Sequence, residues 1–144
     1  MVTTGVAPLC ALGWSKRTSQ GWRSQTGGAV ETIFDLASVT KPFTAFAVAR
    51  SPHLNRHTPL HEVLPEMHRS FAGNARIETL LAHRSGLLGH VPLFLPLATG
   101  QPFDASRALV DAAESARSDL NRGAESFAPV YSDLGYMLVG AALA

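Results

Sequence analysis

The 144-residue sequence is short of cysteine, of charge and of long apolar runs, and each shortage excludes a class of protein. Its single cysteine, Cys10, allows neither an internal disulfide framework nor a cysteine-based metal site. No apolar run approaches the ~20 residues that a membrane-spanning helix needs. The net charge is +1 and no basic patch is present, which argues against nucleic acid as a partner.

The N-terminal stretch "MVTTGVAPLCALGW" is mildly apolar but has no positively charged start, so it does not resemble a signal peptide. We therefore expect a cytoplasmic protein with no membrane partner. What the sequence does contain is the composition of a globular chain, 46% hydrophobic and 16% charged. Its length predicts one domain with enough residues to bury an apolar core.

The strands are expected near the N-terminus, within residues 5–36. Segments 5–14 and 20–25 predict a short β pair, in which Pro8 limits the first strand to an irregular or edge role. The β-branched and aromatic residues of 26–34, which follow a Gly-Gly pair, predict a loop and a third extended piece.

A helix is predicted from Ala37 or Ser38 to about residue 50, because the apolar residues change to helical spacing there. Pro42 is compatible with this helix only in its first turn. The apolar positions at helical spacing are Val39, Phe43, Phe46 and Ala47.

The remainder, residues 51–144, is expected to be a helical region. Three prolines make 51–66 a surface connection with room for one short turn, and 75–86 predicts a short helix closed by Gly86 in the C′ position. Residues 104–117 form an amphipathic pattern capped by Asp104. Residues 131–144 are apolar nearly all round, which predicts a buried helix with Ser132 or Asp133 as its cap.

The stretch "FDLASVTK" places Ser38 three residues before Lys41, nearly one helical turn, so both side chains share a face. A serine at a helix start meets unpaired backbone N–H groups and the positive end of the helix dipole. A desolvated lysine one turn later loses its proton more readily and can act as the base that activates the serine. The alternative is an N-capping serine beside a solvent-facing lysine, and the motif alone does not decide between them.

A second candidate group lies at the start of the last predicted helix. In "PVYSDLGYMLVG", Tyr131 stands at a loop-to-helix junction. A tyrosine there can share the proton of the serine with Lys41, since a nearby ammonium favours the phenolate. Taken alone, Tyr131 is equally compatible with a core aromatic residue whose hydroxyl is satisfied.

Three stretches together resemble the serine β-lactamase and penicillin-binding-protein superfamily, in its class C β-lactamase-related branch. "TIFDLASVTKPFTA" is similar to the nucleophile motif, "LLAHRSGL" to the segment "LLTHTSGL", and "FAPVYSDLGYMLVG" to the segment that carries the family's tyrosine. The resemblance implies an α+β, β-lactamase/transpeptidase-like fold and a small-molecule acyl substrate. It makes Ser38 the acylated nucleophile, Lys41 its partner base and Tyr131 the second acid/base.

One departure from the family pattern concerns substrate binding. The family's Tyr-x-Asn is Tyr131-Ser132-Asp133 here, so a carboxylate that can only accept hydrogen bonds replaces an amide that can also donate. We expect Asp133 to favour a charged Lys41 and to disfavour substrates that bear a carboxylate. The other register, Ser132-Asp133-Leu134 as a Ser-Asp-Asn motif, fails at Leu134 and leaves Tyr131 unexplained.

The other departure is that the family's third motif, Lys-Thr-Gly or His-x-Gly on a later strand, does not occur. We therefore expect residues 1–144 to be the N-terminal portion of a single β-lactamase-related domain with an incomplete sheet, a possible partner being the missing C-terminal half. The expected function is that of a serine hydrolase acting on an ester, a β-lactam or a D-alanyl peptide through an acyl-enzyme. This portion is expected to be inactive alone, and the alternative is a non-catalytic remnant or interaction module.

No metal or other cofactor is expected. His53, His57 and His61 recur every four residues, as zinc ligands on a helix do, but Pro52 and Pro59 break any such helix. A Gly-x-Ser-x-Gly nucleophile elbow is also absent.

Overall fold

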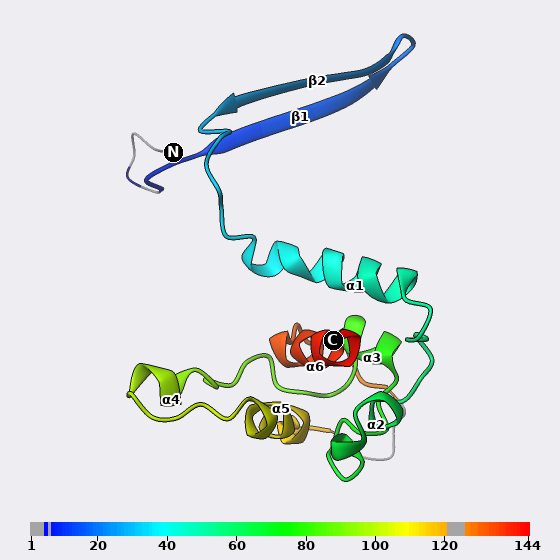
Figure 1. Ribbon diagram of the computed structural model, residues 1–144. Coiled ribbons are helices and arrows are strands. Elements are labelled where there is room, and N and C mark those ends of the chain that lie inside the picture. The colour runs from blue at the N-terminus through cyan, green and yellow to red at the C-terminus, as the bar shows by residue number, and fades with distance from the viewer. Residues whose placement is uncertain (1–4, 6, 121–125) are drawn as a thin grey trace. The chain divides into compact units, whose positions relative to one another are not determined.

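The computed structural model describes residue 5 and residues 7–120 and 126–144, and it divides the chain into two compact units. A hairpin unit covers Met1–Ala37 and a helical unit covers Ser38–Ala144. Within the described residues, no helix combines the length and the apolar character that a membrane crossing requires. In chain order (Figure 1) the elements are β1 (Ala11–Thr18), β2 (Gly21–Gly28), the 3-10 helix η1 (Ala37–Val39), α1 (Thr40–Arg50), α2 (Leu60–Val63), the 3-10 helix η2 (Pro65–Met67), α3 (Ile77–Leu81), α4 (Leu95–Ala98), α5 (Ala105–Glu114) and α6 (Asp133–Leu143).

The hairpin unit consists of β1 and β2, paired antiparallel from Ala11↔Gly28 to Thr18↔Gly21. Two residues connect the strands, and Gly21 supplies the positive φ of 112° that the turn requires. The predicted β pair is therefore confirmed, but the first strand starts at residue 11 rather than 5. Pro8, which has no N–H to donate, lies outside it.

The prediction of a third extended piece within 26–34 is wrong, because no separate strand forms there. β2 continues to Gly28, whose φ of 80° turns the chain, and the following amide of Ala29 donates to the Cys10 carbonyl at 2.9 Å. A Cβ at Gly28 would lie 2.3 Å from that same carbonyl oxygen, so only glycine fits this close approach. Residues 29–36 contain turns and no strand.

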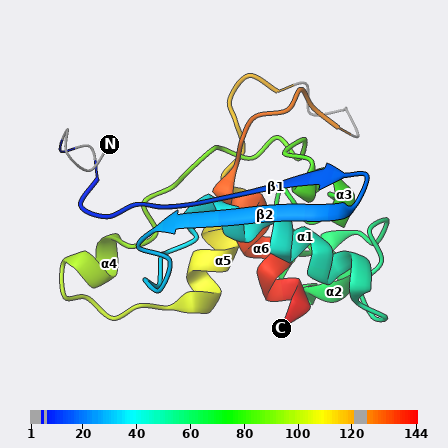
Figure 2. The same cartoon turned by 90° about the horizontal axis from the view of Figure 1, so that it is seen from above.

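Helix α6 is the central element of the helical unit, in contact with α1, α2, α3 and α5 (Figures 1 and 2). Ser132 is its N-cap and accepts from the Gly135 amide at 3.5 Å, so the cap is Ser132 and not Asp133. Its apolar face lies in one buried cluster with residues from the other helices. The cluster contains Val48, Leu54, Leu60, Met67, Ala72, Ile77, Leu80, Leu87, Ala112, Ala113, Leu134, Leu138 and Val139.

Helix α1 confirms the helix predicted from Ala37 or Ser38 to about residue 50, with η1 forming its first turn. The apolar positions that guided the prediction do not, however, face the buried cluster. Phe43 and Phe46 are exposed, while Val48 on the opposite side is buried. Helical spacing identified the helix, but it did not identify which face packs against α6.

Segment 51–66 has the short helical turn that the prediction allowed, but it is not only a surface connection. It contains α2, and η2 overlaps its end. Leu60 in α2 and Met67 in η2 are fully buried, so this segment contributes to the core. Pro59 and Pro65 stand immediately before or at the first position of these short helices, where the missing N–H has no helical partner to lose.

Helix α5 begins as predicted, because the Asp104 carboxylate accepts from the Arg107 amide at 2.9 Å. It ends at Glu114, three residues before the predicted end. Helix α3 is also shorter than predicted, and its C-cap is Ala82. Gly86 does not take the C′ position; its φ of 79° belongs to the loop after the helix.

Helix α6 approaches α3 closely at Gly135. A Cβ on Gly135 would lie 3.1 Å from the Leu80 carbonyl oxygen, whereas a Cβ on Gly140 would meet nothing within 4 Å. Both glycines lie inside α6, so each is less favourable than alanine there by about the same helix propensity. Replacing each glycine by alanine therefore separates the effect of close packing on stability from the effect of helix propensity.

We expect Gly135→Ala to lower the free energy of unfolding by about 1–2 kcal/mol, because overpacking outweighs the propensity gain. Gly140→Ala should raise the free energy of unfolding by up to about 1 kcal/mol. Urea unfolding followed by circular dichroism measures both values. Equal stabilisation by the two substitutions would show that α3 and α6 are not packed as closely as described.

Candidate active site

Ser38 lies in η1, just before α1, and its hydroxyl does not cap the helix. Instead, the Tyr131 hydroxyl donates to Ser38 Oγ at 2.7 Å. The preceding residue, Ala37, has a φ of 43°, a conformation that non-glycine residues seldom adopt. The capping alternative for Ser38 is therefore wrong, and its oxygen is paired with a phenol from the other end of the chain.

Lys41, one turn after Ser38, points toward the start of α6. Its Nζ lies 2.5 Å from Asp133 Oδ1 and 4.7 Å from the centroid of the Tyr131 ring. The lysine side chain is 14% exposed, while that of Asp133 is 41% exposed. All four residues singled out in the sequence thus converge at one site, formed by the first turns of α1 and α6.

The pKa values of this group are shifted by the contacts between its members. Burial alone would lower the pKa of Lys41, but its hydrogen bonds with Asp133 and Tyr131 and the nearby negative charge outweigh burial, and the pKa of Lys41 is raised. The pKa of Tyr131 is lowered, first by the interaction of its hydroxyl with Lys41 and then by the hydrogen bond with Ser38. The direction for Lys41 is opposite to the one that a neutral lysine base requires.

Two histidines also belong to this site, although neither was identified from the sequence. The His83 ring lies 4.7 Å from the Tyr131 ring, and its Nδ1 accepts from the Ser132 amide at 3.0 Å. His90 Nδ1 lies 3.7 Å from Asp133 Oδ2. His83 occurs in the stretch "LLAHRSGL", which the sequence analysis used only as a sign of resemblance. No spacing rule connects a histidine at 83 with a tyrosine at 131.

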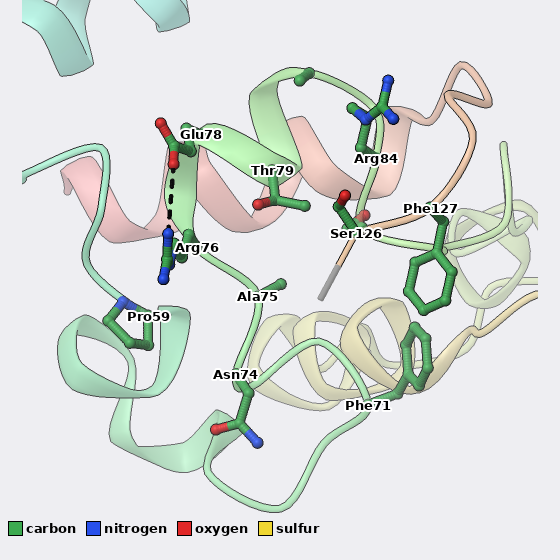
Figure 3. Close-up of a pocket in the computed structure, with 12 residues that line it drawn as sticks. Pro59, Phe71, Asn74, Ala75, Arg76, Glu78, Thr79, Arg84, Ser126 and Phe127 are labelled. Carbon is green, nitrogen blue, oxygen red and sulfur yellow. Dashed lines mark ion pairs between the residues drawn. The ribbon is translucent and has the colours of Figure 1, made fainter. Parts of the chain in front are cut away.

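A hollow of about 860 Å³ occurs elsewhere in the helical unit, between the segment 59–85 and the residues Ser126 and Phe127 (Figure 3). Phe71 and Phe127 stack on one side of it, with ring centroids 6.2 Å apart. None of the four site residues lines this hollow, so it is separate from the group around Ser38.

The histidines considered as zinc ligands do not form a site. His57 Nδ1 is 3.1 Å from Glu78 Oε1, and His61 Nδ1 is 3.0 Å from the Gly73 carbonyl oxygen. In the part of the chain that the structure describes, no three metal-ligating side chains come together.

The hairpin and the packed helices make the chain α+β, and it holds a serine that is hydrogen-bonded to a tyrosine beside a lysine. A sequence model of the Beta-lactamase family matches residues 3–144, nearly the whole chain. The chain therefore belongs to the beta-lactamase family, as the three sequence stretches indicated. No curated protein and no solved structure matches it.

The lowered pKa of Tyr131 depends chiefly on Lys41, and this dependence can be measured. We expect Lys41→Met, which keeps the length of the side chain but removes its charge, to raise the pKa of Tyr131. Lys16→Met in β1 is the control, since it removes the only other lysine. The measurement is a pH titration of the ¹³Cζ-tyrosine NMR signal in a Tyr136→Phe background. If both lysine variants leave the pKa of Tyr131 in place, Lys41 is not the cation that lowers it.

Proposed function

We propose that the chain carries the acylation machinery of a serine hydrolase, with Ser38 as nucleophile, Tyr131 as the group that moves protons and Lys41 as the cation that lowers the pKa of Tyr131. The observation that carries this proposal is the 2.7 Å hydrogen bond between Tyr131 Oη and Ser38 Oγ beside a lysine ammonium. A nucleophile within hydrogen-bond reach of a base, which is itself tuned by a third group, is the arrangement that covalent catalysis needs.

The proposed base is the phenolate of Tyr131, not the amine of Lys41. Lys41 is held as an ammonium by Asp133, while the same ammonium lowers the pKa of Tyr131. As Ser38 Oγ forms a bond to the acyl carbon, the phenolate takes the serine proton. Tyr131 then gives that proton to the leaving group as the old acyl bond breaks, which regenerates the phenolate and leaves an acyl-Ser38 ester.

Deacylation reverses the roles with water as the attacking group. Tyr131 takes a proton from the water as its oxygen bonds to the acyl carbon, and returns it to Ser38 Oγ as the ester bond breaks. The backbone N–H of Ser38, at the start of a helix, is one donor for the oxyanion. The products are a free acid and the unmodified serine, so the cycle needs no cofactor.

The substrate class is an ester, a β-lactam or a D-alanyl peptide, and Asp133 favours neutral members of that set. Its carboxylate is 41% exposed and lies within the same group of side chains as the nucleophile. A substrate carboxylate bound nearby would experience like-charge repulsion, which is a means of rejecting a ligand without changing the catalytic atoms. We therefore place neutral esters ahead of anionic β-lactams.

The second candidate is a non-catalytic interaction module of the same fold. The observation in its favour is that the Lys41 ammonium is engaged with Asp133 rather than free to lose a proton. If Tyr131 does not ionise at the working pH, the site has no base and Ser38 stays unreactive.

Covalent labelling of Ser38 distinguishes the two candidates. We expect a fluorophosphonate probe to modify the wild-type chain on the peptide that contains Ser38, as read by mass spectrometry. Labelling should increase as the pH rises through the lowered pKa of Tyr131. Stoichiometric labelling is chosen because it needs the nucleophile and its base, whereas turnover also needs a complete oxyanion hole.

In the same experiment, Ser38→Ala should abolish labelling, and Ser106→Ala, which removes an exposed serine on α5, should leave it unchanged. A wild-type chain that stays unlabelled at all pH values while remaining folded by circular dichroism would support the non-catalytic module instead.

Asp133 gives a second prediction, about substrate charge. We expect Asp133→Asn to raise the rate of acylation by an anionic β-lactam relative to a neutral ester roughly three- to tenfold. The reason is the loss of about 1 kcal/mol of like-charge repulsion. Asp111→Asn on α5 is the charge-matched control. A ratio that is the same in both variants would mean that Asp133 acts only through its ion pair with Lys41.

A further inference from the structure

His83 has a backbone conformation that usually belongs to glycine. Its φ is 58°, and it occupies the C′ position after α3. Its amide donates to the Leu80 carbonyl at 3.1 Å, and the Arg84 amide donates to the Thr79 carbonyl at 2.9 Å. This pair of hydrogen bonds is the Schellman motif, in which glycine is the common C′ residue because a Cβ is disfavoured there. A histidine in this conformation costs more conformational energy than a glycine would. We therefore expect its side chain to make contacts that offset this cost.

The side chain and backbone of His83 hold the Tyr131 segment on both sides. The His83 carbonyl accepts from the Val130 amide at 3.0 Å, and Nδ1 accepts from the Ser132 amide at 3.0 Å. Between these two bonds, the imidazole lies 4.7 Å from the Tyr131 ring, tilted by 33°. The three contacts restrain both the backbone and the ring of the tyrosine.

We propose that His83 is a positioning residue that holds the Tyr131 hydroxyl against Ser38 Oγ, and that it does so as a neutral imidazole protonated only on Nε2. The tautomer follows from the hydrogen bond, because an amide N–H can donate to Nδ1 only if that nitrogen carries a lone pair. This inference rests on the proposed function and adds the residue that orients its base.

The charges around His83 favour the same neutral form. Burial lowers the pKa of His83, and the Lys41 ammonium on α1 lowers it further. Asp133 at the start of α6 acts in the opposite direction but is engaged with Lys41 and lies near His90. Two further titratable neighbours are Tyr131, with its ring 4.7 Å away, and Tyr136 on α6, with its ring 5.3 Å away. The pKa of His83 is therefore below its ordinary value, and the hydrogen bond to Ser132 is lost only as the pH falls through it.

The tautomer can be tested without any activity. We expect a long-range ¹H–¹⁵N spectrum of the wild-type chain at neutral pH to show the proton of His83 on Nε2 and a bare Nδ1. A proton on Nδ1, or a cationic ring at that pH, would overturn the proposal.

Two substitutions at His83 then test its positioning role, since both residues tolerate a positive φ. His83→Gly suits the backbone but removes the ring and the acceptor. His83→Asn has an amide oxygen that can take the place of Nδ1. We expect His83→Gly to move the pKa of Tyr131 up toward its ordinary value and to slow labelling of Ser38 by about 10²-fold, as a misplaced catalytic group does. His83→Asn should recover most of both losses relative to His83→Gly.

The Tyr131 pKa and the labelling rate separate a positioning role of His83 from an effect on folding stability. The tautomer measurement separates it from the proposed catalytic function. Both variants suit the helix end, so thermal unfolding should show folded proteins, and the pKa of Tyr131 does not follow stability as such. If His83→Gly leaves both the Tyr131 pKa and the labelling rate unchanged, or if His83→Asn loses as much as His83→Gly, the positioning role is refuted. If the wild-type chain is not labelled at all, the proposed function fails, while the tautomer and the Tyr131 pKa still decide the role of His83.

Discussion

The ion pair between Lys41 and Asp133 joins the first turn of α1 to the first turn of α6, across 92 positions of sequence. Because the two helices meet at these ends, Ser38 and Tyr131 come within hydrogen-bond distance. The same contact settles the charge of the lysine. Burial lowers the pKa of Lys41, but the Asp133 carboxylate at 2.5 Å and the Tyr131 side chain together outweigh burial, so the pKa of Lys41 is raised.

The Lys41 ammonium lies next to the Tyr131 phenol and shifts its pKa downward. The hydroxyl of that phenol is the group that donates to Ser38 Oγ. Environments that push the pKa values of neighbouring groups in opposite directions are how proteins assign acid and base roles at neutral pH. In this chain the raised pKa of Lys41 and the lowered pKa of Tyr131 are two results of one arrangement.

The scaffold that supports the arrangement is the loop after α3 together with the start of α6. Ser132 Oγ donates to the Leu88 carbonyl at 2.6 Å, and the Asp133 amide donates to the Gly89 carbonyl at 2.9 Å. With the bonds made by His83, these contacts tie the Tyr131 segment to the loop along its length. Helix α6 also packs closely on α3 through Gly135, near the end of α3 from which this loop starts.

Much of the secondary structure was predictable from local sequence patterns. The Ser38–Lys41 spacing, the caps Asp104 and Ser132, and the existence of the β pair all depend on residues a few positions apart, whose conformations follow from period and capping chemistry. The loop-to-helix junction had already singled out Tyr131, and the resemblance added Asp133. The structure brings these residues together, while their catalytic roles stay predictions. The errors in secondary structure are the third extended piece and several element ends.

The features that only the tertiary structure decided depend on residues that are distant from one another in the sequence. The pKa of Lys41 is raised rather than lowered because Asp133 lies against it, and no local rule gives that distance. Helix α3 ends at Ala82 with His83 in a left-handed conformation, although Gly86 is the better local candidate, and the contacts of His83 with Tyr131 and Ser132 form in that conformation. Local sequence patterns thus predicted the longer helices and the residues that meet at the candidate site. Long-range contacts decided their protonation states and the residue that orients them, because electrostatic and hydrogen-bond energies depend on distance in space, not on separation along the chain.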